Sequence, residues 1–227
     1  QALSATQVAG LTRNQILALS TTQVAGLATT QVAALSLAQL SGLSMDDLQA
    51  MSAAQVGVLT ASQVGGLSPA VLAALSTTQV AAFAATQMKG LTAAQISLLT
   101  TAQVAALSSS VFAALTSTQL RVLTSNGVSA LSSTQLSALS STQLGVLATQ
   151  GVAQFTATQV SALTGTQMSG LSTTQIRQLS STVAGALAAT QLGSLSSGQI
   201  GAFSVTATAA LEPSLLVSLT SPQLAGL

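Results

Sequence analysis

The sequence contains no cysteine, histidine, tryptophan or tyrosine, and its only aromatic residues are four phenylalanines. Without Cys or His, the chain can form no disulfide framework, no zinc site and no Cys–His nucleophile pair. The abundant Ser and Thr hydroxyls have no histidine to act as their base, and no phosphate-loop or zincin motif occurs. The sequence therefore predicts that the protein is not an enzyme and offers no catalytic residue, no cofactor-binding residue and no metal ligand.

Charge is also scarce, because only 3% of the residues are charged, against about 25% in a typical globular domain. Four Lys and Arg residues cannot form the cationic surface that nucleic acid requires, which excludes a nucleic-acid partner. The mean hydropathy is +0.67. Gln, Ser and Thr nevertheless interrupt every apolar run of about 20 residues, so no membrane span is expected.

What the sequence does contain is a repeat of eight residues that runs from Leu3 to Leu227 without insertion or deletion. Position one of the octad is Leu in 24 of 28 octads, and Phe or Met in the others. Position two is Ser or Thr in 23 octads, position five is Gln in 20, and position six is almost always a large apolar residue. The period is shorter than that of the common solenoids, so each unit must be smaller than a helix pair.

The order of residues in the octad predicts one short helix. Ser or Thr followed three residues later by Gln is a capping box, and the apolar residues at positions one and six form the accompanying hydrophobic staple. Pro69 and Pro213 fall at position three, the first helical position, and Pro222 falls at position four, still in the first turn. Of the 17 glycines, 13 lie at positions seven or eight, where the helix must end and the chain reverse.

Helices this short are not stable alone, so neighbouring octads must stack and share one apolar spine. We therefore expect an all-α solenoid of 28 short capped helices, one per octad, forming a single uninterrupted array over residues 1–227. One long helix is excluded, because its Leu stripe would rotate by about 80° per octad. A β-solenoid remains the alternative because Thr and Val favour strands, although positions one and six would face opposite sides of a strand.

The two ends of the sequence resemble its middle. The chain opens at positions seven and eight of an octad, and no signal peptide is visible. The terminal octads also lack the polar surface that usually caps a solenoid. These features predict a segment of a longer chain, or association end to end.

The few charged residues each have a structural explanation. Asp46 and Asp47 form the only acidic pair; Asp47 replaces Gln at position five and is expected to cap the same helix terminus. A bound cation would need more oxygen ligands than this pair supplies. Glu212, before Pro213, is expected to cap its helix in the same way. The basic residues are expected to be solvated and to form no patch: Arg13, Lys89, Arg121 and Arg177.

Larger or unusual residues also follow the repeat. The Phe and Met residues at positions one and six are expected to pack in the spine, and the methionines are expected to pack there rather than bind haem: Phe83, Met88, Phe112, Phe155, Met168 and Phe203. The Asn126-Gly127 step and Gly151 are expected to mark relaxed octads.

The run Leu75-Ser76-Thr77-Thr78-Gln79-Val80-Ala81-Ala82 resembles octapeptide tracts in large bacterial exoproteins that are commonly labelled adhesin-like or haem-utilisation-like. The resemblance covers essentially the whole chain and implies a secreted or cell-surface location. The residues do not support the haem-binding role that one of these labels implies, because His, Cys and Tyr are absent.

A nearly uncharged chain lacks the repulsion that keeps proteins apart. We therefore expect the partner to be the protein itself, as a homo-oligomer or fibre that grows laterally or end to end, in an extracellular structural filament or sheath. Two alternatives remain: the passive stalk of a cell-surface adhesin, or a repetitive ice- or glycan-binding face built from the Thr-rich positions three and four. No small-molecule ligand is expected.

Overall fold

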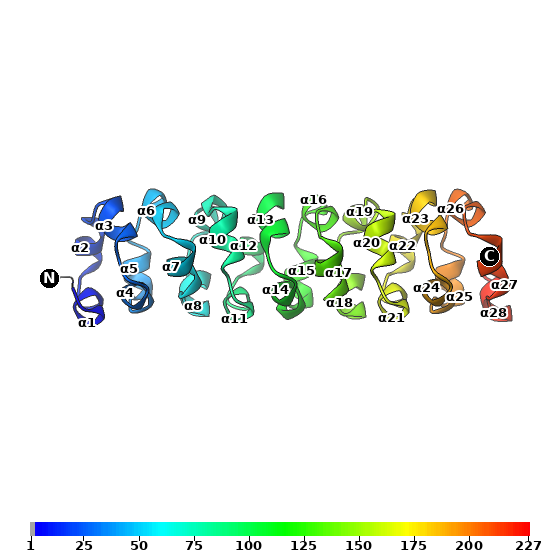
Figure 1. Cartoon of the computed structure of the whole chain (residues 1–227), viewed down its shortest axis with the longest axis horizontal. Helices are drawn as coiled ribbons and strands as arrows, with labels where there is room; N and C mark the ends of the chain where they lie inside the picture. Colours follow the sequence, from blue (N-terminus) through cyan, green and yellow to red (C-terminus); the bar gives the residue numbers. More distant parts are fainter. Residues whose placement is uncertain (1–2) are drawn as a thin grey trace. The chain divides into compact units, whose positions relative to one another are not determined.

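The computed structural model describes residues 3–227, in which each octad forms one α-helix of four to six residues (Figure 1). No strand occurs among these residues, so the all-α expectation is confirmed and the β-solenoid alternative is wrong. The helices are α1 (Ala5–Ala9), α2 (Arg13–Leu17), α3 (Thr21–Ala25), α4 (Thr29–Ala33), α5 (Leu37–Leu40), α6 (Met45–Ala50), α7 (Ala53–Gly57), α8 (Ala61–Gly65), α9 (Pro69–Ala74), α10 (Thr77–Ala81), α11 (Ala85–Met88), α12 (Ala93–Ser97), α13 (Thr101–Ala106), α14 (Ser109–Ala114), α15 (Ser117–Arg121), α16 (Ser125–Ser129), α17 (Ser133–Ser137), α18 (Ser141–Gly145), α19 (Thr149–Val152), α20 (Ala157–Ser161), α21 (Gly165–Ser169), α22 (Thr173–Arg177), α23 (Ser181–Gly185), α24 (Ala189–Gly193), α25 (Ser197–Ile200), α26 (Val205–Ala209), α27 (Pro213–Val217) and α28 (Ser221–Leu224).

The capping box starts most of these helices, as α3 illustrates. Ser20 has an extended backbone (φ −73°, ψ 155°), and its hydroxyl accepts a hydrogen bond from the backbone N–H of Gln23. In return, the Gln23 side-chain oxygen accepts from the Ser20 N–H at 2.8 Å. Pro69 and Pro213 begin their helices, and Pro222 lies in the first turn of α28, as expected.

The helices end without a left-handed residue, in contrast to the expected use of glycine as a reversing residue. No described residue has a positive φ. In α3 the Leu27 N–H instead donates to the Val24 carbonyl at 3.1 Å. The next residue, Ala28, then adopts the extended conformation (φ −68°, ψ 152°) that starts the following helix. The chain therefore changes direction at the extended residue in position two. The frequent glycines at positions seven and eight are not needed for a left-handed turn.

The chain divides into two compact units, Gln1–Leu115 with α1–α14 and Thr116–Leu227 with α15–α28. Within each unit a helix packs against the helix three octads later, as in α3 with α6 and α23 with α26. Hydrogen bonds between coils join residues 25 to 31 positions apart. One turn of the solenoid therefore takes slightly more than three octads.

Positions one and six form the core of each unit. The position-six side chains Val8, Val80 and Leu144 are completely buried, and Leu91 at position one is 4% exposed. The continuous apolar spine expected from the sequence is thus confirmed within each unit. None of the helices in residues 3–227 has the length and apolar character needed to cross a bilayer.

Candidate functional site

The most elaborate polar structure in this chain is the glutamine at position five, and Gln95 in α12 shows its geometry. The side chain is 2% exposed. Its oxygen accepts from the Thr92 N–H at 2.8 Å, which completes the capping box. Its amide nitrogen donates to the carbonyl oxygens of Leu67 at 2.7 Å, Gly65 at 3.1 Å and Val64 at 3.3 Å. One amide group therefore caps the start of its own helix and binds the end of a helix in the preceding coil.

This arrangement repeats through both units, and we call it the glutamine ladder. Each member donates from its amide nitrogen to the position-one carbonyl 28 residues earlier in the chain. The members whose contacts lie within one unit are Gln31, Gln39, Gln55, Gln63, Gln79, Gln87, Gln95, Gln103, Gln159, Gln167, Gln175, Gln191, Gln199 and Gln223.

The sequence predicted that the side-chain oxygen of this glutamine caps its own helix, but it did not predict that the amide nitrogen binds the preceding coil. A capping box accepts Glu or Gln at its third helical residue, yet position five is Gln in 20 octads and Glu in none. The absence of Glu from position five was the signal in the sequence that the amide nitrogen is needed. Glutamate would cap the helix equally well but would have no donor for the carbonyl groups of the preceding coil.

Glycines at positions seven and eight allow adjacent coils to approach closely. A Cβ atom added at Gly90 would overlap the carbonyl oxygen of Ala61 and lie 2.6 Å from its carbonyl carbon. Because these neighbours are backbone atoms, they cannot rotate away as a side chain can. In three pairs of glycines 25 residues apart, a Cβ on the first glycine would overlap the carbonyl oxygen of the second: Gly65 with Gly90, Gly145 with Gly170, and Gly201 with Gly226.

Gly151, expected to mark a relaxed octad, instead lies in a tight contact. A Cβ there would lie 2.5 Å from the Cβ of Val128 and 2.7 Å from the carbonyl oxygen of Ser125. Glycine at position five thus lets α19 lie directly against α16. In α16 the Thr124 hydroxyl accepts a hydrogen bond from the Gly127 N–H at 3.1 Å. The Asn126-Gly127 step therefore also lies within a regular capped helix.

Asp47 occupies the position of the ladder glutamine in α6 and caps that helix, as expected. It is 7% exposed and accepts hydrogen bonds from the Ser44 hydroxyl at 2.6 Å, the Ser44 N–H at 3.0 Å and the Thr21 hydroxyl at 3.0 Å. Burial raises the pKa of this carboxyl group, but these hydrogen bonds lower it by more, and the resulting pKa lies below the ordinary 3.8.

A lowered pKa in the folded state means that the ionised Asp47 stabilises the protein above about pH 4 and that this contribution is lost as the pH falls through the folded-state pKa. We therefore expect Asp47→Asn to lower the free energy of unfolding more at pH 6 than at pH 2. Urea unfolding followed by circular dichroism at both pH values measures the difference. The exposed neighbour gives the matched control, since Asp46→Asn removes the same negative charge and leaves the hydrogen bonds of Asp47 with Ser44 and Thr21 in place. An Asp47→Asn effect of equal size at both pH values would contradict this assignment.

The remaining charged residues are not members of the glutamine ladder. Glu212 occupies the expected cap position of α27, but its side chain makes no capping hydrogen bond, so that prediction is wrong. Arg13 is exposed and also donates to the Ser41 carbonyl at 3.4 Å. The other basic side chains are exposed, as expected: Lys89, Arg121 and Arg177. Among the described residues, no group of three or more acidic, His or Cys side chains is placed to hold a metal ion.

The Phe and Met residues at positions one and six pack in the core, as the repeat predicted. Met88, Met168 and Phe112 are completely buried. The three phenylalanines at position one are 3 to 7% exposed: Phe83, Phe155 and Phe203.

Residues 42–77 match the ALTTAQ repeat. This ALTTAQ segment includes the octads of Asp47, Gln55 and Gln63, and it supports a repeat-containing protein. No match is found among curated proteins. Among solved structures, the chain is similar to the leucine-rich repeat-containing protein LegL7 of Legionella pneumophila, with 13% identity over 88% of this chain and 79% of that chain. The TM-score is 0.25, which is too low for that likeness to support any further argument.

Proposed function

We propose that this chain is a structural, self-assembling component of an extracellular filament, fibre or sheath of a bacterium. The observation that supports this proposal is the interface between coils. Its hydrogen bonds join residues 25 to 31 positions apart, and most of the side chains at positions one and six are buried beside them. A coil therefore packs on its neighbour without a covalent cross-link, and we propose that copies of the chain associate through contacts of the same kind.

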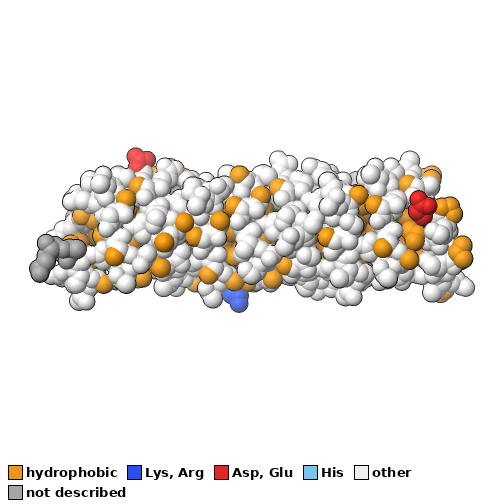
Figure 2. Space-filling model, viewed as in Figure 1, with side chains coloured by type: hydrophobic (Ala, Val, Ile, Leu, Met, Phe, Trp, Pro, Cys, Tyr) orange, Lys and Arg blue, Asp and Glu red, His pale blue; other side chains and the backbone are white. Residues whose placement is uncertain are grey.

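The outer surface supports the same proposal. Position four is exposed in every octad and position three is exposed or half-buried, and both are mostly Ser, Thr or Ala. Charged residues make up 3% of the chain, and few charged side chains lie on the face shown in Figure 2. Charge repulsion between copies is correspondingly weak. The resemblance to octapeptide tracts of bacterial exoproteins supports a location outside the cell.

Electron microscopy of the purified chain over a range of concentrations, together with sedimentation velocity, tests this proposal. We expect fibres whose amount increases with protein concentration. Because few charges are present, the fibres should persist from about 0.01 M to about 1 M salt, where the Debye length falls from about 30 Å to about 3 Å. A chain that stays monodisperse at every concentration would contradict the proposed function.

A further inference from the structure

The glutamine ladder is interrupted at α9, in the interior of the first unit. Position five of this octad is Val71, which has neither the oxygen nor the amide nitrogen of glutamine. The Ser68 hydroxyl still accepts from the Val71 N–H at 3.2 Å, so the helix keeps half of its capping box. The octads on either side carry complete ladder members, since Gln63 and Gln79 donate to position-one carbonyl groups at 2.6 and 2.8 Å. One member is therefore missing between two intact ones.

A hollow of about 180 Å³ lies at this interruption. Its wall is largely apolar, because Leu43, Leu48 and Leu67 are buried and Val71 is half-buried. The lining also includes the exposed Ser68, so the hollow reaches the solvent. One water molecule takes about 30 Å³ in the liquid, and the hollow is therefore large enough for a small organic molecule.

Valine occupies position five in three octads, and the other two are paired with a larger residue in the preceding coil. The position-one residue 28 positions before Val111 is Phe83, and the one before Val183 is Phe155. Both phenylalanines are 3% exposed. The corresponding residue for Val71 is the smaller Leu43. The α9 octad thus loses the volume of glutamine without the added volume of phenylalanine.

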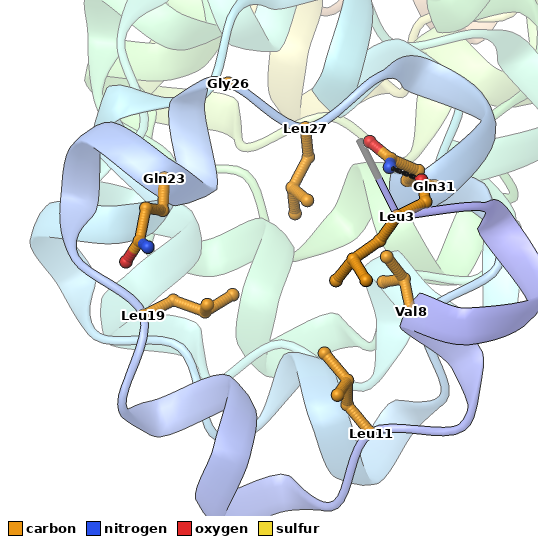
Figure 3. A pocket seen from close by; sticks show the side chains of 8 residues that line it. All are labelled: Leu3, Val8, Leu11, Leu19, Gln23, Gly26, Leu27 and Gln31. Carbon is orange, nitrogen blue, oxygen red and sulfur yellow. Dashed lines mark hydrogen bonds between the residues drawn. The ribbon is translucent and has the colours of Figure 1, made fainter. Parts of the chain in front are cut away.

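The two backbone groups that a ladder amide joins are both present at the hollow. In a complete member, one carboxamide accepts from the position-two N–H and donates to the position-one carbonyl of the preceding coil; Figure 3 shows the second bond, from Gln31 to Leu3. The matching groups here are the Ser68 N–H and the Leu43 carbonyl. Neither group has a hydrogen-bond partner within residues 3–227, although buried backbone groups are almost always paired.

We propose that this hollow binds a small molecule that carries a primary carboxamide. The ligand oxygen accepts from the Ser68 N–H, its NH₂ group donates to the Leu43 carbonyl, and a short alkyl chain lies against the buried leucines. The next octad shows that one carboxamide spans this pair of groups, because the Gln79 amide accepts from the Ser76 N–H at 2.8 Å and donates to the Met51 carbonyl at 2.8 Å. The site departs from the expectation that the chain binds no small molecule, and it does not depend on filament formation.

Propionamide is a direct probe, because it reproduces the carboxamide and the two other carbons of a glutamine side chain. Saturation-transfer difference NMR with the unmodified protein is expected to show binding with a dissociation constant of about 1–10 mM, within the range open to so small a ligand. Propionate and N,N-dimethylpropionamide lack the N–H donor for the Leu43 carbonyl. We expect each of them to bind at least about tenfold more weakly.

The substitution Val71→Gln supplies the missing amide from the protein itself. Glutamine occupies position five in 20 octads, so this variant is expected to fold and to lose propionamide binding. Leu43→Phe fills the hollow from the preceding coil and is expected to have the same effect. The matched control is Ala70→Gln, which places an extra amide at the exposed position four of α9 and leaves the hollow open. This control is expected to bind propionamide as the unmodified protein does.

Far-ultraviolet circular dichroism establishes that each variant is folded before the titrations are compared. The site is supported if Val71→Gln abolishes binding and Ala70→Gln retains it. It is overturned if propionamide does not bind the unmodified protein, or binds the folded Val71→Gln variant equally well. Equal binding of propionamide and N,N-dimethylpropionamide would also overturn it, because the carbonyl group of Leu43 would then take no part in recognition.

Discussion

Replacing Gly170 with alanine is expected to destabilise the second unit by about 3 kcal/mol, near the upper end of the usual cost of overpacking. A Cβ at this position would overlap the carbonyl oxygen of Ser141 and lie 2.6 Å from both its carbonyl carbon and its Cα. All three are backbone atoms, so no side-chain rotation relieves the overlap. Helices α18 and α21 must move apart, and the core contacts between their coils are weakened. Urea unfolding followed by circular dichroism at 222 nm measures the effect.

Gly193 provides the matched control in the same unit. It is the last residue of α24, and an added Cβ would meet nothing within 4 Å. Gly193→Ala is therefore expected to be neutral or to stabilise the protein by about 0.4–1 kcal/mol, because alanine restricts the unfolded chain more than glycine does. Equal effects of the two substitutions would show that these glycines do not serve the close approach of coils.

The local structure of each octad could be predicted because its causes lie within a few residues. The Ser20 and Gln23 side chains bind each other's backbone N–H groups across three positions, and that spacing is visible in the sequence. Pro69 and Pro213 mark the first helical residue in the same local way. The all-α architecture followed from these signals together with the period of eight.

The contacts between coils could not be predicted, because they depend on the number of octads per turn. The amide nitrogen of Gln95 meets carbonyl groups 28 to 31 residues earlier, and Gly65 meets Gly90 from 25 residues away. No local rule fixes those separations. The sequence therefore showed where glycines and glutamines occur but not which atoms of the neighbouring coil required them.

The outcomes at the acidic positions differ for a local reason. Asp47 was correctly expected to cap α6, because from position five its carboxylate accepts from the Ser44 N–H and hydroxyl groups, as the side-chain oxygen of Gln accepts from the N–H of position two in other octads. Glu212 was wrongly expected to do the same for α27. Efficient N-cap residues have short side chains with an oxygen close to the backbone. Glutamate is longer, and Pro213 removes one of the N–H groups at that terminus.

Each ladder amide binds two coils, and the substitution Gln95→Glu tests this dual role most directly. Glutamate preserves the size of the side chain and the oxygen that accepts from the Thr92 N–H. The nitrogen that donates to Leu67 is replaced by an oxygen that faces carbonyl groups in a site that is 2% exposed. A buried charge without a partner is expected to lower the free energy of unfolding by about 3–5 kcal/mol.

The same substitution at Gln15 isolates the cross-coil bond. Gln15 has the same capping box with Thr12, but it is exposed and its amide nitrogen makes no hydrogen bond within the described residues. We therefore predict that urea unfolding at pH 7 will show a loss of about 3–5 kcal/mol for Gln95→Glu and a change within about 0.5 kcal/mol for Gln15→Glu. Equal free energies of unfolding for the two variants would contradict the account, because the capping box alone would then explain every glutamine of the repeat.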